Sequence, residues 1–190
     1  MKEMGREVIV GVTGHRFLAE VAKIITGIDA ALRQIEASFS GKHLVIISPL
    51  AEGADQLVAR RVLARPGTRL IVPLPLARAD YVTDFESPET FLNLLEQADE
   101  VIELPPAPTR NQAYEAASRY VLDNCDVLIA VWDGKAAQGQ GGTGEIVALA
   151  RQRGLPLAWV RAGNRHPGTR QPTTLGEEQG IVSFERFPTR

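Results

Sequence analysis

Short apolar runs that alternate with amphipathic stretches constrain the fold of this chain more than any other feature of its sequence. The runs are mostly continuous and rich in β-branched residues, which suits strands covered on both faces of a parallel sheet. They cover residues 8–12, 44–48, 70–73, 101–104, 127–132 and 157–160. Between them, apolar residues at helical spacing predict helices over 21–39, 55–63, 87–98, 111–122 and 145–153.

Strands that alternate with helices form right-handed βαβ units, and these build a doubly wound sheet. We therefore predict the α/β class: a Rossmann-like three-layer sandwich with a mostly parallel sheet of roughly six or seven strands. A length of 190 residues suits one domain, with its core over 6–161, a long loop over 162–180 and an edge strand over 181–187. Ligands of such sheets bind beyond the carboxyl ends of the strands, so a site is expected in the turns that follow them.

Composition narrows the partners that this chain is expected to have. Its formal net charge is −2, so no overall field draws it to nucleic acid or anionic lipid. No segment approaches about 20 consecutive apolar residues, and no secretory leader is recognisable. The single cysteine, Cys125, fits a reducing compartment. We expect a cytoplasmic protein with neither a membrane nor a nucleic acid as its partner.

Metal and cofactor sites are not expected from the residue pattern. The three histidines, His15, His43 and His166, are far apart in the sequence and lack metal-ligand spacing. The dinucleotide fingerprint, with its acidic residue about 20 positions further on, is absent, which argues against an NAD-dependent oxidoreductase.

The first turn that could carry chemistry runs from Gly11 to Arg16, directly after the first predicted strand. Gly11 and Gly14 permit a tight turn and close backbone approach, and exposed amides leading into a helix favour an anion. Thr13 could donate a hydrogen bond to a phosphate, and His15 and Arg16 could supply positive charge. In the alternative interpretation these residues cap the turn and pair with a neighbouring carboxylate.

The second turn covers residues 48–55, after the second strand and before a helix. It again combines a small hydroxyl residue, Ser48, and a glycine, Gly53, with a helix start. Glu52 and Asp55 would oppose a phosphate, so we interpret them as contacts for ribose hydroxyls, as partners for Arg16 or as helix caps. Capping is the favoured interpretation for Asp55.

The third turn begins at Asp133 and Gly134 and holds four glycines within six positions. Glycines add ordering entropy, and their bare amides can form an anion nest. Thr143 can donate a hydroxyl, and Glu145 in the first helical turn could act as a ligand or catalyst. The alternatives are a flexible loop and an acidic residue that favours a helix N-terminus. The glycines are Gly139, Gly141, Gly142 and Gly144.

Polar and aromatic residues elsewhere are expected at the same rim. Arg110 and Asn111 follow a proline-rich crossing and begin a helix, so they could bind phosphate or a base edge, with a surface role as the alternative. Tyr81 or Phe85 could stack on a base, although burial in the core is favoured for Phe85.

The second turn, with the helix that follows it and the sequence at 70–75, resembles the Ser-Gly-x-Ala-x-Gly-x-Asp pattern of DNA-processing Smf-type proteins. Residues 11–16 and 141–145 are similar to the matching turns of the wider SLOG superfamily, which also contains the Lonely-Guy phosphoribohydrolases. The resemblance covers about residues 6–161. It implies a Rossmann-like sheet that binds nucleotides or nucleotide-derived signals and a homo-oligomer of two or more copies.

In the hydrolase branch of that superfamily, an arginine and the glutamate of a Gly-Gly-x-Gly-Thr-x-x-Glu motif act on a nucleoside monophosphate. The resemblance places these roles at Arg110 and Glu145, with a shorter spacing between the glycine pair and the glutamate. Residues 124–145 also resemble the nucleoside deoxyribosyltransferases, whose nucleophilic glutamate follows a similar stretch. Both relatives act at an N-glycosidic bond.

Two functions follow as hypotheses. The first is a sensor or binding protein for a nucleoside phosphate or an ADP-ribose-like molecule, held at the carboxyl ends of the strands. The alternative is an N-glycosidase in which Glu145 stabilises or attacks the anomeric carbon while Arg110 holds phosphate. A single-stranded DNA binder of the Smf type is disfavoured because the chain is near neutral and lacks a basic stripe interleaved with aromatic residues.

Overall fold

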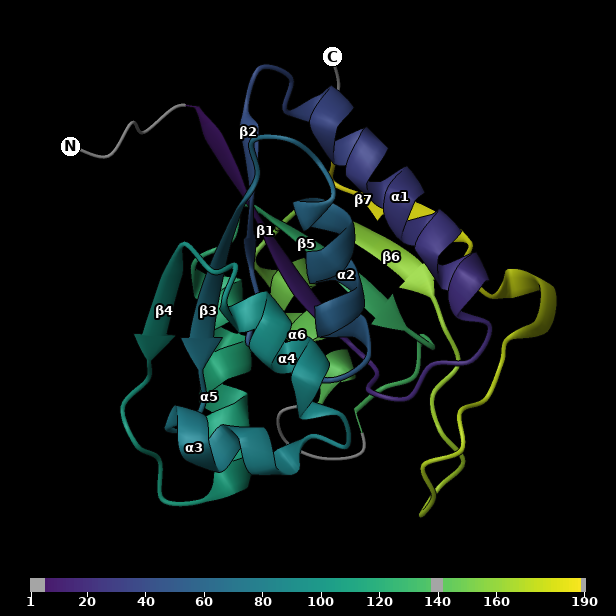
Figure 1. The fold of residues 1–190 in the computed structure, drawn as a ribbon. Coiled ribbons are helices and arrows are strands. Elements are labelled where there is room, and N and C mark those ends of the chain that lie inside the picture. The colour runs from purple at the N-terminus through teal and green to yellow at the C-terminus, as the bar shows by residue number, and fades with distance from the viewer. Residues whose placement is uncertain (1–5, 138–141, 189–190) are drawn as a thin grey trace.

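The computed structural model describes residues 6–137 and 142–188 and is built around one seven-stranded sheet (Figure 1). The strand order is β4-β3-β2-β1-β5-β6-β7, and every neighbouring pair is parallel except β6 and β7. The prediction of an α/β, mostly parallel, Rossmann-like sheet is confirmed. The strands are β1 (Glu7–Gly14), β2 (His43–Ile47), β3 (Arg69–Leu74), β4 (Glu100–Glu103), β5 (Val127–Trp132), β6 (Leu157–Arg161) and β7 (Val182–Glu185).

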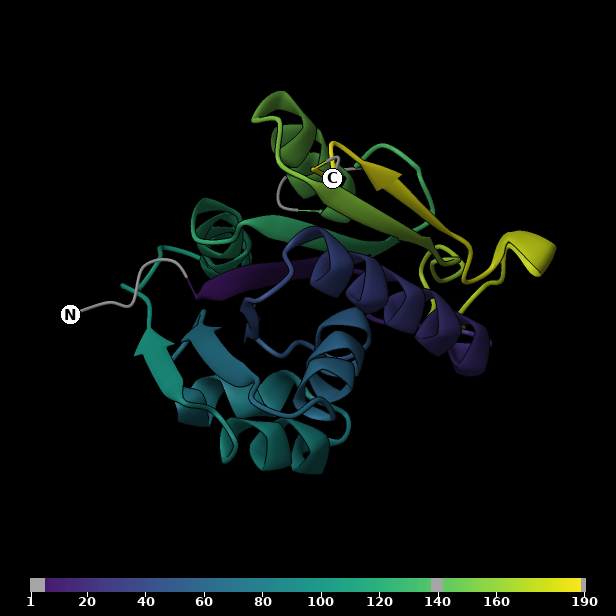
Figure 2. The same cartoon turned by 90° about the horizontal axis from the view of Figure 1, so that it is seen from above.

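Helices cover both faces of the sheet, which gives three layers. Figure 2 shows α1 and α2 on one face and α5 and α6 on the other, and α4 packs on α2. The short helix α3 and the 3₁₀ turn η1 (Val82–Asp84) were not predicted from the sequence. The helices are α1 (Val21–Ser38), α2 (Ala54–Leu63), α3 (Arg78–Tyr81), α4 (Pro88–Leu95), α5 (Arg110–Asp123) and α6 (Thr143–Gln152).

Strand β5 explains why the apolar runs are continuous. Side chains of a strand point alternately to its two faces, and all six residues of β5 are buried. Ile129 and Val131 join the core under α1 and α2, whereas Leu128 and Ala130 join a second core under α6. Because both faces are covered, neither face requires polar residues.

The strand order reverses beside β1, which pairs with β2 on one side and with β5 on the other. The chain first winds outward through β2, β3 and β4 and then returns to β5. At such a switch point the connections after the two central strands leave toward opposite faces, so a crevice opens at the carboxyl ends of the strands.

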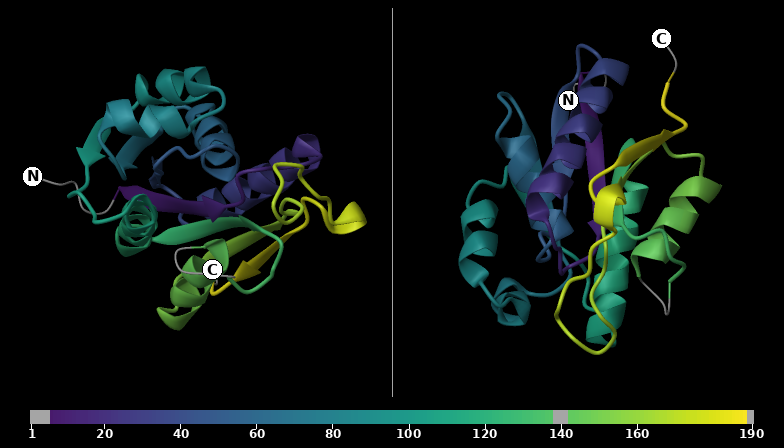
Figure 3. Two further views of the ribbon diagram at one scale, coloured as in Figure 1. Left: turned by 90° about the horizontal axis from the view of Figure 1, so that it is seen from below. Right: turned by 90° about the vertical axis from the view of Figure 1, so that its right-hand side faces the viewer.

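The chain between β6 and β7 projects past the carboxyl ends of the strands (Figures 1 and 3). It contains a bridge between Arg165 and Pro172 and the 3₁₀ turn η2 (Gly176–Glu178). The buried Gln179 links the two ends of this segment. Its side-chain oxygen accepts hydrogen bonds from the backbone amides of Gly163 and Leu175. In the described part of the chain, no helix is long and apolar enough to cross a membrane.

Candidate functional site

A pocket of about 220 Å3 lies at the carboxyl ends of the strands, between α5 on one side and α3 with η1 on the other. It contains aromatic rings, two carboxylates and several hydroxyl groups. The lining residues are Val12, Thr13, Gly14, Arg16, Pro49, Ala51, Asp55, Pro75, Tyr81, Asp84, Phe85, Tyr114, Ala117, Ser118, Val121 and Thr143.

The two glycines of the first turn sit where neighbouring elements approach closely. A Cβ at Gly14, which lines the pocket, would lie 2.5 Å from the Ala54 Cβ and 2.6 Å from the Val131 carbonyl oxygen. A Cβ at Gly11 would lie 2.9 Å from the Cys125 Sγ. Both glycines therefore have a packing reason, since only a residue without a side chain lets β1 approach α2, β5 and the end of α5 this closely.

His15 is buried beside Asp133 and does not line the pocket. Its Nε2 accepts a hydrogen bond of 3.1 Å from the Asp133 amide and lies 3.3 Å from the Asp133 carboxylate. Burial lowers the pKa of His15, and Asp133 offsets part of that effect. His15 was expected to supply positive charge to a ligand; instead it links the end of β1 to the residue that follows β5.

Gly134 and the Asp133 side chain form the start of the third turn. Gly134 has a φ of +82°, and a Cβ there would lie 2.9 Å from the indole of Trp159. The Asp133 carboxylate also accepts the amide of Lys135 at 3.1 Å. Both residues are therefore engaged in shaping the turn after β5.

Asp55, in the first turn of α2, points its buried carboxyl into the pocket. One carboxylate oxygen accepts the Ala51 amide at 3.2 Å. Burial raises the pKa of Asp55 to about 7, while the Ala51 amide, the Ser48 hydroxyl and the charge of Arg16 lower it in part. Asp55 is thus a carboxyl whose protonation changes near neutral pH, in a position where a ligand would meet it.

The turn around Asp55 is held in an uncommon backbone conformation. Ser48 accepts the Leu50 amide at 3.0 Å, and Leu50 has a φ of +59° although it is not a glycine. The Gln56 side chain donates to the Leu50 carbonyl. Gly53 has a φ of +85°, and a Cβ there would lie 2.3 Å from the Arg16 carbonyl oxygen. A residue other than glycine, such as Leu50, costs free energy in the left-handed conformation and adopts it only where the surrounding structure imposes it.

Glu52 connects the second turn to the segment before α4. One of its oxygens accepts the amides of Glu86 and Ser87 at 2.7 and 3.1 Å, and the other lies 3.3 Å from the Arg16 guanidinium. Arg16 also donates to the Asp84 carbonyl. The interpretation of Glu52 as a partner for Arg16 matches this geometry.

Arg16 stands at the rim of the pocket with 44% of its side chain exposed. Among the described lining residues it is the one with a cationic side chain. Its two acceptors are a half-buried carboxylate and a backbone carbonyl, so the guanidinium retains donors that face solvent and the pocket.

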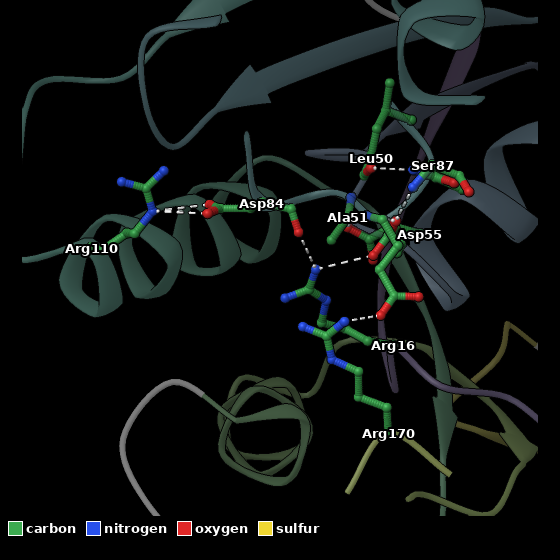
Figure 4. A network of polar contacts seen from close by, with 11 residues as sticks. Arg16, Leu50, Ala51, Asp55, Asp84, Ser87, Arg110 and Arg170 are labelled. Atoms are coloured by element: carbon green, nitrogen blue, oxygen red, sulfur yellow. Dashed lines mark hydrogen bonds and ion pairs between the residues drawn. The ribbon is translucent and has the colours of Figure 1, made fainter. Parts of the chain in front are cut away.

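Arg110 and Asn111 lie beside the pocket rather than in it. The Arg110 Nε lies 3.1 and 3.0 Å from the two Asp84 carboxylate oxygens (Figure 4). An Nη of Arg110 donates to the Asp80 carbonyl at 2.9 Å. Arg110 thus holds the start of α5 against α3 and η1. Asn111 is exposed.

Of the third turn, Thr143 at the start of α6 reaches the pocket, whereas Glu145 does not line it. The Glu145 carboxylate accepts a hydrogen bond of 2.8 Å from Arg119. Gly142 precedes α6 as its N-cap, and a Cβ at Gly144 would lie 2.6 Å from the Ala137 amide nitrogen. The predicted ligand residue Gly141, and Gly139 with it, lie outside the described residues.

One wall of the pocket was missed in the sequence. Tyr114, Ala117, Ser118 and Val121 form it from a single face of α5. Their spacing of three and four residues shows that they share a helix face. Because Ala117 and Val121 are ordinary core residues at helical spacing, this face reads in the sequence as helix packing.

Tyr81 is 2% exposed and packs edge-on against Phe85, with a ring-centroid distance of 4.9 Å. Within the described residues its hydroxyl has no hydrogen-bond partner, yet it is not sealed from solvent. Since Tyr81 lines the pocket, its side chain borders the space that a ligand would fill.

Comparison with known proteins identifies the fold. No protein-family model matches the chain, and no curated protein matches its sequence. A solved structure of DNA processing protein A from Helicobacter pylori is similar, with 19% identity, 92% of this chain and 70% of that chain covered, and a TM-score of 0.51.

Two further solved structures are similar over most of this chain. DNA processing protein A from Streptococcus pneumoniae has 20% identity and a TM-score of 0.50; 80% of this chain is matched, but only 49% of that longer chain. The Moco carrier protein from Chlamydomonas reinhardtii has 18% identity and a TM-score of 0.43; the match covers 80% of this chain and 75% of that chain. At these identities the DNA processing A structures establish a shared α/β fold.

The expectation that nucleic acid is not a partner is wrong as a deduction from the net charge. The Helicobacter pylori protein, which shares this fold, is described by its single-stranded DNA binding mode. The physical reason is that net charge sums over the whole surface, whereas a strand is bound by the cations and rings along one groove.

Proposed function

We propose that this chain binds a nucleotide or a nucleotide-derived small molecule in the pocket at the carboxyl ends of β1, β2 and β3. One observation carries the proposal: aromatic rings, a buried carboxyl and a rim arginine meet in a single concave site at the switch point of the sheet. Ligands of open α/β sheets bind at that position.

The division of polar and apolar groups supports a nucleotide over a purely apolar ligand. Tyr114, which lines the pocket from α5 and packs at a tilt against Tyr81 with centroids 6.0 Å apart, offers an aromatic ring to the flat face of a base. Arg16 at the rim and the Thr143 hydroxyl at the start of α6 suit an anionic group such as a phosphate. We infer a binding or sensing role, and the shared fold with DNA processing A proteins supports placement of the chain in the SLOG superfamily.

Titration calorimetry with nucleoside mono- and diphosphates and ADP-ribose tests the proposal. Charge-assisted hydrogen bonds contribute about 1.5–3 kcal/mol, so Arg16→Ala is expected to weaken binding by roughly ten- to a hundredfold. Arg153→Ala, an exposed arginine at the far end of α6, is the matched control and leaves affinity unchanged. Absence of saturable binding with every ligand contradicts the proposal.

The N-glycosidase alternative receives less support from the geometry. Glu145 is paired with Arg119, and Arg110 with Asp84, so neither predicted catalytic residue lines the pocket. The test is release of free base from nucleoside monophosphates, with Glu145→Gln as the variant. Turnover that this variant abolishes would establish the alternative.

A second candidate, single-stranded DNA binding, is favoured by the likeness to the Helicobacter pylori protein. Fluorescence anisotropy with a labelled oligothymidine at several salt concentrations measures it directly, since phosphate contacts make the affinity fall with salt. Competition by a mononucleotide would show that the strand enters the same pocket.

We also propose a homo-oligomer, as the family resemblance implies. Light scattering coupled to size-exclusion chromatography gives the mass in solution. A mass equal to that of one 20.7 kDa chain at all concentrations would overturn this proposal.

A further inference from the structure

Asp55 is a buried carboxyl that no ion pair compensates. It is 7% exposed, and within the described residues no cationic nitrogen lies at ion-pair distance from it; Arg16 acts on it only through its charge. Burial of a carboxylate without partners is costly, and pairing or hydrogen bonding offsets the cost. The partners that Asp55 lacks in the protein are therefore sought in the pocket that it faces.

The Asp55 carboxylate has more hydrogen-bond acceptor sites than the protein fills. An ionised carboxylate offers about four acceptor sites. The Ala51 amide and the Ser48 hydroxyl occupy two of them. Roughly two acceptor sites are left for a ligand, and the unpartnered hydroxyl of Tyr81 in the same pocket adds one donor.

Resting on the proposed function, we propose that the pocket recognises a guanine base through Asp55 and Tyr81. The ring N1–H and the exocyclic N2–H of guanine would donate to Asp55, and the O6 carbonyl beside them would accept from the Tyr81 hydroxyl. These three groups are adjacent on one edge of guanine, so they fill the vacant hydrogen-bonding positions together.

The other bases match these positions less well. Adenine and cytosine each present one exocyclic amine beside a ring nitrogen that accepts, and this acceptor would face the carboxylate. Uracil presents one N–H between two carbonyls, one of which would face the carboxylate. Each mismatch leaves a buried polar group unpaired, and sites of this kind discriminate strongly against such analogues.

With the base inside, the sugar and phosphate are directed outward to the rim. Arg16, 44% exposed, and Thr143 lie among the lining residues there. The ligand class is therefore a guanine nucleoside phosphate, bound with its base in the pocket and its phosphate near solvent.

Binding is also expected to depend on pH, because guanine requires the ionised form of Asp55. Burial raises the pKa of this carboxyl to about 7, so affinity for GMP rises with pH up to that region and levels off above it. The other charged and titratable groups that line this pocket are Arg16 from the first turn, Tyr81 from α3, Asp84 from η1 and Tyr114 from α5. Glu52 does not line the pocket, but its charge acts on Tyr81.

The experiment measures affinities for GMP, AMP and XMP with the wild-type chain, Asp55→Asn and Tyr81→Phe. The wild type is expected to prefer GMP over AMP by about tenfold or more. Asp55→Asn is expected to lose GMP affinity by about ten- to a hundredfold and to gain XMP affinity, because an amide N–H can donate to the C2 carbonyl of xanthine. Tyr81→Phe weakens GMP binding by a smaller factor, and Asp80→Asn, an exposed carboxyl on α3, leaves it unchanged.

Equal affinity of the wild type for GMP and AMP would overturn the inference, as would an Asp55→Asn variant that binds GMP like the wild type at all pH values. Binding of monophosphates without preference for a base removes this inference and leaves the proposed function in place. Binding of none removes both. If Asp55→Asn does not fold, the inference is tested by the ratio of GMP to AMP affinity in the wild type and by the change of that ratio in Tyr81→Phe.

Discussion

Asp55→Asn is expected to change the pH dependence of stability in a defined direction. The substitution keeps the shape of the side chain and an oxygen that can accept the Ala51 amide, but it removes the titration. In the unfolded chain Asp55 ionises near its ordinary value of 3.8, whereas in the folded chain burial raises the pKa to about 7.

The sign of the effect follows from proton binding. Between these two pH values the folded state holds a proton that the unfolded state has released, so the stability of the wild type falls as pH rises from about 4 to about 7 and is flat above. At about 1.4 kcal/mol for each pH unit of difference, the pH-dependent contribution of Asp55 amounts to at most about 4 kcal/mol. Relative to the wild type, Asp55→Asn therefore becomes steadily more stable across that range.

Urea unfolding at pH values from 4.5 to 8.5 measures this difference. Asp80→Asn serves as the control, because it removes an exposed carboxyl from the neighbouring helix and is expected to follow the wild-type curve. A stability difference between Asp55→Asn and the wild type that stays constant within about 0.5 kcal/mol would refute the reasoning, whatever its absolute value.

Three further outcomes are expected. Gly14→Ala should lower the free energy of unfolding by about 1–3 kcal/mol, because the new Cβ would meet backbone and Cβ atoms that cannot move aside. Gly142→Ala is the control: its Cβ would lie 3.6 Å from the Ala137 Cβ, an ordinary contact, so it should cost less than about 1 kcal/mol. Thermal unfolding measures both. Gln179→Leu should leave two loop amides unpaired and cost about 2 kcal/mol or more, detected as faster hydrogen exchange between β6 and β7. An NMR titration should place the His15 midpoint below 6.5, and Asp133→Asn should lower it further, because Asp133 raises the pKa that burial lowers.

The glycines of the first turn have two roles, of which the sequence revealed one. Their position after a strand predicted a ligand contact, and Gly14 does line the pocket. The tight contacts with Ala54 and Cys125 supply a second reason for glycine, and it was invisible in the sequence because those partners are more than 30 residues away.

Charged residues show the same limit more clearly. The sequence placed Arg110 at the correct rim, since it begins the helix after β4, but gave no indication that it would pair with Asp84. Asp55 was interpreted as a helix cap from its position at a helix start. Its burial and its raised pKa depend on the tertiary arrangement of the pocket that it lines.

The sequence alone determined the class of fold and the edge of the sheet at which a site would form. Both follow from local rules, since apolar periodicity sets strand or helix and parallel strands bring their carboxyl ends together. Only the tertiary structure decided which polar groups satisfy one another and which face open space. Pairing depends on distances across the fold: Glu145 meets Arg119, whereas Asp55 and Tyr81 line the pocket.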